Sequence, residues 1–226
     1  MNSIEHVKKS IEKIIARSNV PEDPVHSKNT LAWLLRLKPD ADEALQIAAL
    51  GHDIDRAMEH RKVRRRDFED YDQFKAAHAS NSAVILREIM DTHGLTVKIA
   101  NEVCRLVCRH EVGGDERSDL LKDADSISFF DVNLPFYYRR SGWDETKRRC
   151  RWGYERLSDK MKSVAAQLPF EDHELDAILK STIEASRKDR LKPFHPSRRL
   201  SAYPNRPGKF DANALNLVGL GLHFVS

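Results

Sequence analysis

Residues 48–56 read Ala-Ala-Leu-Gly-His-Asp-Ile-Asp-Arg and end an apolar run in two adjacent side chains that can bind a metal ion, His52 and Asp53. The apolar side chains of residues 41–50 surround almost the whole circumference of a helix. A helix that is apolar all round is one that other elements cover. The stretch therefore predicts a centrally buried helix that ends at His52 and Asp53.

Helical periodicity recurs on both sides of this central helix. It predicts further helices over residues 3–17, 26–37, 74–93, 96–110, 120–130, 143–168 and 173–186. No segment sustains the alternation of apolar and polar residues that marks a strand. Pro135 is expected to stop or kink the helix before it, and the charged residues 54–70 to form an exposed connection. The sequence thus predicts an all-α fold.

The domain organisation follows from length and from a change in composition. A chain of 226 residues accommodates one domain with extensions. From Arg187 the sequence becomes rich in Arg, Lys and Pro and loses its periodicity. We expect an all-helical domain over residues 1–186, with additional helices in 143–186. A basic, Pro-containing tail over 187–226 is expected to be poorly ordered or docked on a neighbour.

The composition argues against a nucleic-acid-binding, membrane or secreted protein. The 38 basic and 35 acidic residues leave a net charge of +3, so nucleic-acid binding is not expected from the charge balance. No apolar run approaches the roughly 18–20 residues needed to span a bilayer, and the first thirty residues lack a signal-peptide core. Cys104, Cys108 and Cys150 are an odd number of cysteines, typical of reduced thiols. We therefore expect a cytoplasmic protein with no membrane partner.

Further metal-capable side chains lie on other predicted helices, at or near helix ends or on apolar faces. They are His26, His78, His110 and Asp125. Imidazole nitrogens and carboxylate oxygens together suit Fe, Mn, Zn, Ni or Co. Ligands scattered along the chain can converge in the core of a helical bundle.

The order of His26, His52-Asp53 and Asp125 resembles the HD-domain superfamily of metal-dependent phosphohydrolases, which share an all-helical fold. Residues 47–54 resemble the family's apolar approach to its His-Asp pair. Residues 121–125, Leu-Lys-Asp-Ala-Asp, resemble its Lys-x-Ala-Asp element, in which the second acid is the ligand. The resemblance covers roughly residues 20–135 and implies an HD-domain-like helical bundle. It favours Asp125 over Asp123 as the ligand.

His78 and His110 occupy places where a dinuclear branch of the superfamily supplies extra ligands. That branch includes cyclic-dinucleotide phosphodiesterases and symmetrical dinucleoside-tetraphosphate hydrolases. The resemblance thus implies one or two divalent ions, from Fe, Mn, Zn, Ni or Co, with Mg as a further option. Asp53 is the carboxylate that would bridge two ions.

The resemblance also implies a reaction, hydrolysis of a phosphate ester or anhydride by metal-activated water. The expected substrate is a small phosphorylated molecule, with a nucleotide as the favoured class. Asp53, Asp55 and Arg56 are the candidate catalytic residues. Arg56 lies where relatives often carry a phosphate-binding Lys, and a guanidinium can hold phosphate through two hydrogen bonds. Arg109 and Lys122 are further candidate substrate contacts.

Several positions keep a second interpretation. Asp55 is either a proton shuttle or a solvated acid, and Arg109 and Lys122 are either phosphate contacts or solvated neighbours. Residues 61–66 form either a solvated face or a rim that attracts anions. The aromatic residues are expected mainly in the core, although one or two could stack on a nucleobase. These are Phe136, Tyr137, Tyr138, Trp143 and Trp152.

Two other functions compete with hydrolysis. The first is a non-catalytic module that senses or regulates through nucleotide binding at the same pocket. The second is nucleic-acid binding through residues 61–66 and the basic tail. Metal identity, substrate and oligomeric state have no signature in the sequence.

Overall fold

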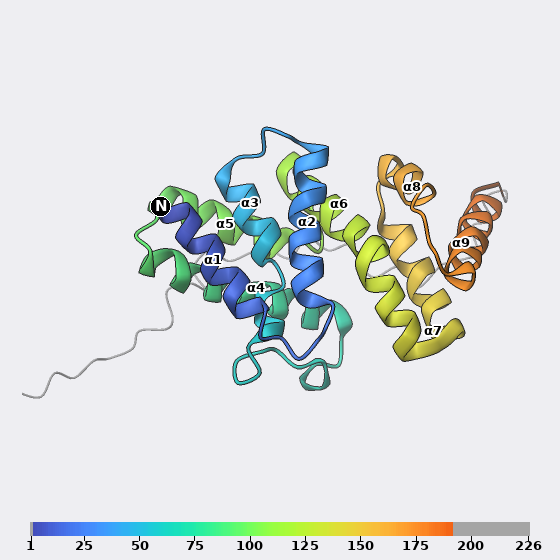
Figure 1. The fold of residues 1–226 in the computed structure, drawn as a ribbon, viewed down its shortest axis with the longest axis horizontal. Coiled ribbons are helices and arrows are strands. Elements are labelled where there is room, and N and C mark those ends of the chain that lie inside the picture. The colour runs from blue at the N-terminus through green and yellow to red at the C-terminus, as the bar shows by residue number, and fades with distance from the viewer. Residues whose placement is uncertain (1, 192–226) are drawn as a thin grey trace, which may run out of the picture. The chain divides into compact units, whose positions relative to one another are not determined.

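A computed structural model describes residues 2–191 and consists of helices and their connections (Figure 1). The α-helices are α1 (Ser3–Ile15), α2 (Asp23–Leu37), α3 (Glu43–Gly51), α4 (Tyr71–Thr92), α5 (Val97–Arg109), α6 (Glu116–Ser128), α7 (Leu134–Arg156), α8 (Asp159–Ala165) and α9 (His173–Leu191). Two 3₁₀ turns, η1 (Ile54–Ala57) and η2 (Arg65–Asp67), and a π-helical turn, η3 (Phe129–Asn133), complete the set. No β-strand occurs within residues 2–191, so the all-α prediction is confirmed.

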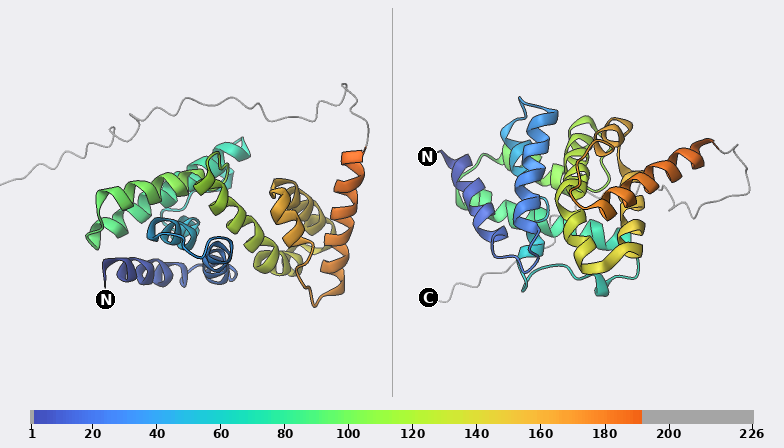
Figure 2. Two further views of the ribbon diagram at one scale, coloured as in Figure 1. Left: turned by 90° about the horizontal axis from the view of Figure 1, so that it is seen from above. Right: turned by 45° about the vertical axis from the view of Figure 1, so that its right-hand side comes forward.

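Helix α3 lies between its neighbours, with α1 and α2 on one side and α5 on the other (Figure 2). Asp42 caps its first turn by accepting a hydrogen bond from the Leu45 backbone N–H at 3.0 Å. Leu45, Ile47 and Ala48 are all completely buried, although they point in different directions around the helix. The expectation of a centrally buried helix is therefore confirmed, and its C-terminus lies inside the protein.

Two hydrophobic clusters stabilise the described chain. The first is built from α1 to α6 and includes Ile11, Leu50 and Leu106. The second is built from the end of α6 and from α7 to α9, and contains Phe130, among others. Side chains of α2 pack against both clusters. Since each fully buried aliphatic or aromatic side chain contributes about 1.5–3 kcal/mol, both clusters favour the folded state.

Helix α6 continues through η3 directly into α7, so the two clusters are joined by nearly continuous helical chain (Figure 2). Pro135 does not stop a helix here, because it lies in the first turn of α7, where a missing N–H breaks no helical hydrogen bond. Pro24 occupies the same place in α2, which begins at Asp23 rather than at the predicted His26. Both helices start earlier than the sequence pattern suggested.

The predicted helix over 143–168 is two helices in the structure. Helix α7 ends at Arg156, and Ser158 caps α8 by accepting from the Met161 backbone N–H. Helix α9 continues past residue 186, the predicted end of the domain, to Leu191. The predicted tail lies largely outside the described residues, from position 192 onward. Across the described residues, no helix is both long and apolar enough to cross a membrane.

Gly51 ends α3 and packs against Leu86 of α4. A Cβ at this position would lie 2.6 Å from Leu86 Cδ2, and Leu86 is completely buried. We predict that Gly51→Ala lowers the free energy of unfolding by about 1–3 kcal/mol, because it overpacks the core beside His52. Urea denaturation measures the loss. In a Leu86→Ala background Gly51→Ala should lower the free energy of unfolding by less. Equal decreases in both backgrounds would contradict this packing.

Candidate metal centre

The six predicted metal ligands converge in two groups. One group contains His26, His52 and Asp125, and the other contains Asp53, His78 and His110. Within each group the candidate ligand atoms all lie within 4.8 Å of one another. The residues come from α2, α4 and α6 and from the C-terminal ends of α3 and α5. Helices that are distant in sequence thus deliver them to one place.

The first group has the spacing of ligands around a shared ion. His26 Nε2 lies 3.3 Å from His52 Nε2 and 3.1 Å from Asp125 Oδ1. His52 Nε2 lies 3.3 Å from the same oxygen. Ligand atoms about 2.0–2.2 Å from a zinc-like ion are separated by about these distances. The three atoms can therefore bind one ion together.

Asp53 faces both groups. Its Oδ1 lies 2.7 Å from His78 Nε2 and 3.8 Å from His110 Nε2. Its Oδ2 lies 3.9 Å from His52 Nε2, which belongs to the first group. A carboxylate placed in this way can give one oxygen to each of two ions.

His52 and His110 are held in the same way, each as the residue that follows a helix. His52 Nδ1 lies 3.0 Å from the Ala49 carbonyl oxygen, and His110 Nδ1 lies 2.7 Å from the Val107 carbonyl oxygen. A carbonyl can only accept, so Nδ1 carries the proton and donates. This leaves the lone pair on Nε2, the atom that points toward the other ligands.

The other two histidines are oriented by side chains. His26 Nδ1 lies 3.0 Å from Ser128 Oγ, whose own proton is directed to the His26 carbonyl oxygen. His78 Nδ1 lies 2.5 Å from Asp55 Oδ1. In all four histidines Nδ1 is thus occupied and Nε2 is left for the centre. This is the arrangement that metal-binding histidines share, and the residues fit a divalent ion.

Asp55 is not a solvated acid, so one of the two interpretations of this position is wrong. The residue is completely buried, and its Oδ2 also accepts from the Val63 backbone N–H at 3.1 Å. Asp55 contacts the Nδ1 side of the His78 imidazole, opposite the candidate ligand atom Nε2. It therefore influences the candidate metal centre by orienting that imidazole.

The carboxylates control the protonation of the histidines. Burial lowers the pKa of His52, but the carboxylates of Asp53 and Asp125 outweigh it and raise the pKa to about 9. Burial likewise opposes a charge on His78, and Asp53 and Asp55 raise its pKa to about 10. Burial lowers the pKa of His110. A metal cation would compete with protons for the same nitrogens, so metal binding would release protons.

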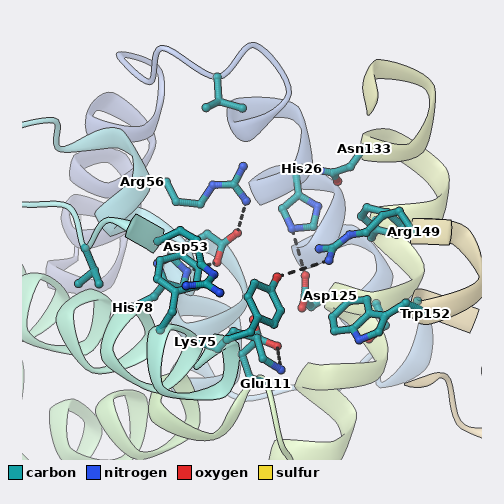
Figure 3. A pocket seen from close by; sticks show the side chains of 18 of the residues that line it. His26, Asp53, Arg56, Lys75, His78, Glu111, Asp125, Asn133, Arg149 and Trp152 are labelled. Atoms are coloured by element: carbon teal, nitrogen blue, oxygen red, sulfur yellow. Dashed lines mark hydrogen bonds and ion pairs between the residues drawn. The ribbon is translucent and has the colours of Figure 1, made fainter. Parts of the chain in front are cut away.

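The two groups open onto a cavity of about 540 Å³ (Figure 3). His26, Asp53, His78 and Asp125 lie around it. Eight cationic side chains line the cavity against three carboxylates. The cations are Arg56, Lys62, Arg64, Arg65, Arg66, Lys75, Arg149 and Arg156, and the carboxylates are Asp53, Glu111 and Asp125. The excess positive charge favours an anionic ligand.

Arg56 lies beside the second group. Its guanidinium joins two carboxylates, 2.9 Å from Asp53 Oδ2 and 2.8 Å from Asp23 Oδ1. It also lines the cavity and is about one third exposed. Arg64, Arg65 and Arg66 line the cavity as well, in agreement with the rim interpretation of residues 61–66 rather than a purely solvated face.

Two predicted substrate contacts do not reach the cavity. The Arg109 guanidinium donates to the Gly113 carbonyl oxygen and lies 3.8 Å from Asp115. Lys122 Nζ lies 3.4 Å from Asp119. Neither residue lines the cavity. Asp123 belongs to neither ligand group and accepts a hydrogen bond from Ser158 instead.

The sequence interpretation missed a wall of the cavity formed by α4 and α7. Lys75 lies one turn before His78, and Arg149, Trp152 and Arg156 follow one another at helical spacing on α7. This spacing on one helix face was a usable signal. Trp152 was expected mainly in the core but is half-buried in the cavity wall, and Trp143 is 37% exposed and so outside the core.

Comparison with protein families identifies the family to which most of the chain belongs. Residues 4–178 match the model of a family described as "Domain of unknown function (DUF4202)". No curated protein and no solved structure matches the chain. The matched residues include all six candidate ligands and the cavity wall from α7. The chain therefore belongs to the DUF4202 family.

Proposed function

We propose that this protein is a metal-dependent phosphohydrolase with an HD-type centre, acting on a small phosphorylated molecule such as a nucleotide. One observation carries the proposal. Two His/Asp groups, with Asp53 of the second group also facing the first, lie at the base of a cavity whose lining is strongly cationic. Ligands for divalent ions and cations for phosphate oxygens in one cavity are the parts that phosphoryl transfer to water requires.

His26, His52 and Asp125 would hold one divalent ion, and Asp53, His78 and His110 a second. A bound divalent ion supplies Lewis acidity toward phosphoryl oxygens and lowers the pKa of water. The protein fixes the direction of each Nε2 through the group behind its imidazole. This orientation excludes the wrong tautomer before any substrate arrives.

Arg56 would bind a phosphoryl oxygen from the side of the second group. Its two carboxylate partners hold the guanidinium in place and keep it charged at all physiological pH values, since Asp53 and Asp23 raise its pKa against the effect of burial. The exposed third of the side chain leaves N–H groups for a ligand. Such a charge-assisted contact stabilises negative charge that develops on phosphate oxygens.

The function is tested by metal analysis followed by phosphate release. We predict that the purified protein binds a transition metal. It should also release phosphate or a phosphorylated product from at least one member of a panel of nucleotides, dinucleotides and sugar phosphates. His52→Ala and Asp53→Ala should reduce turnover to that of the metal-free protein, because each removes a ligand atom. Mass spectrometry measures the metal content, and a phosphate assay measures the turnover.

His60→Ala is the matched control, because His60 is exposed and does not line the cavity. Its metal content and turnover should equal those of the wild type. Bound metal without turnover across the panel would contradict hydrolysis and favour the nucleotide-sensing alternative. Absence of bound transition metal after anaerobic purification would contradict both.

Asp55→Asn tests the support behind His78. An amide can present its N–H to Nδ1, so the imidazole loses its acceptor and its fixed tautomer. We predict that metal affinity at the Asp53, His78, His110 group falls about 10- to 100-fold, while the first group is affected less. Competition with a chromophoric chelator resolves the two binding events. Asp67→Asn, on the exposed turn η2, should change neither affinity; an equal loss in both variants would contradict the role of Asp55.

A further inference from the structure

Asn133 has a buried side chain without a hydrogen-bond partner at the cavity wall. It is 7% exposed, its Oδ1 accepts no hydrogen bond, and its Nδ2 donates none within the described residues. The residue ends the π-helical turn η3 and lines the cavity (Figure 3). Oδ1 is an acceptor and cannot bind an anion, whereas the Nδ2 group is a donor without an acceptor among the described residues. Because polar groups at such positions are nearly always satisfied, this N–H group is available to a ligand with acceptor atoms. Single π-helical turns within helices are also frequent at functional sites.

Arg149 differs from the other cations on the wall formed by α4 and α7. Arg156 is neutralised by Glu111 at 2.7 Å, and Lys75 lies 3.6 Å from the same carboxylate. Within the described residues no carboxylate lies within ion-pair distance of Arg149; Glu145, one turn earlier, interacts with it electrostatically but forms its ion pair with Arg148. The polar contact of Arg149 is the Tyr71 hydroxyl at 3.4 Å. Its charge is therefore available to a ligand.

The Arg149 guanidinium is nevertheless held in position. It lies 4.3 Å from the centre of the Trp152 ring and 5.4 Å from that of Phe129. Trp152 also has the Arg156 guanidinium 4.4 Å from its ring centre. With cations from the turns before and after it, Trp152 is better suited to orienting guanidinium groups than to stacking on a base. Figure 3 shows Arg149 extending from α7 toward the part of the cavity where His26 and Asp125 lie.

We propose that Asn133 and Arg149 form an anion subsite that does not depend on metal. On the basis of the proposed function, the substrate class is a phosphorylated molecule with a second anionic group, either a further phosphate or a carboxylate. The second group accepts hydrogen bonds from the Arg149 guanidinium and the Asn133 amide. Arg56 and the metal ligands take the phosphoryl group that is cleaved. The subsite selects doubly anionic substrates over simple phosphate monoesters.

The test measures anion binding to the full-length protein without metal. Calorimetric titration with inorganic phosphate and, separately, with acetate at constant ionic strength reports the subsite and distinguishes a phosphate from a carboxylate preference. Arg149→Met should weaken binding of the preferred anion about tenfold or more, since it removes a charge-assisted pair of hydrogen bonds. Asn133→Asp keeps the side-chain shape but adds a negative charge, and should weaken binding at least as much.

Arg148→Met is the matched control. Arg148 is the preceding residue of α7, its side chain is 70% exposed, and its partner is Glu145 rather than the cavity. It should leave anion affinity unchanged, and circular dichroism should confirm that all variants fold. If wild-type protein binds neither anion in the millimolar range, or if Arg148→Met and Arg149→Met weaken binding equally, the subsite is refuted.

The result is separable from the proposed function. The ratio of dissociation constants between Arg149→Met and Arg148→Met is measured without metal, where the proposed metal centre does not contribute. A ratio of one would overturn the subsite, whatever the turnover of the metal-loaded protein; phosphate binding that appears only with Mn²⁺ would report the metal centre instead. Absence of turnover in metal-loaded protein would overturn hydrolysis but leave an Arg149-dependent anion affinity in place.

Discussion

The constraint on which the rest of the structure depends is the pair of largely buried carboxylates of Asp53 and Asp125 beside the C-terminus of α3, each with a side chain only 18% exposed. An isolated buried carboxylate is costly by several kcal/mol, and that cost falls only when cations or donors surround it. Here the imidazoles of His26, His52 and His78 lie within 3.3 Å of one or other carboxylate. These residues come from α2, the end of α3 and α4. Satisfying the two charges thus fixes where three helices meet, and a metal ion would serve the same carboxylates.

The helices, the buried position of α3 and the identity of the candidate ligands could be predicted from the sequence, because they depend on local periodicity and on the order of the His and Asp residues. A helix that is apolar all round had to be buried, which placed His52 and Asp53 inside. Arg109 was misjudged because adjacent residues on a helix point about 100° apart, so a neighbour of His110 in sequence need not share its direction. Lys122 was misjudged because its side chain points back toward the start of α6 and Asp119. The positions of Arg149 and Asn133 at the cavity depend on how α6, η3 and α7 connect. Periodicity alone does not specify this connection.

The second hydrophobic cluster positions α7, which forms part of the cavity wall beside the candidate metal centre. Helix α7 is held by that cluster through Cys150 and Tyr154, while its opposite face presents Arg149 and Trp152 to the cavity. Residues beyond the stretch that resembles HD domains therefore shape the pocket. The family match also extends across α7, so the cavity is made entirely of residues within the matched region.

The central claim is that Asp53 joins two ligand groups, each of which holds one ion. Diffraction from metal-loaded crystals, collected on both sides of the absorption edge of the added metal, tests it most directly. The account predicts two anomalous peaks, one among His26, His52 and Asp125 and one between His78 and His110, with Asp53 contributing an oxygen to each. No anomalous peak in the cavity, or a single peak with Asp53 outside its ligand set, would contradict it.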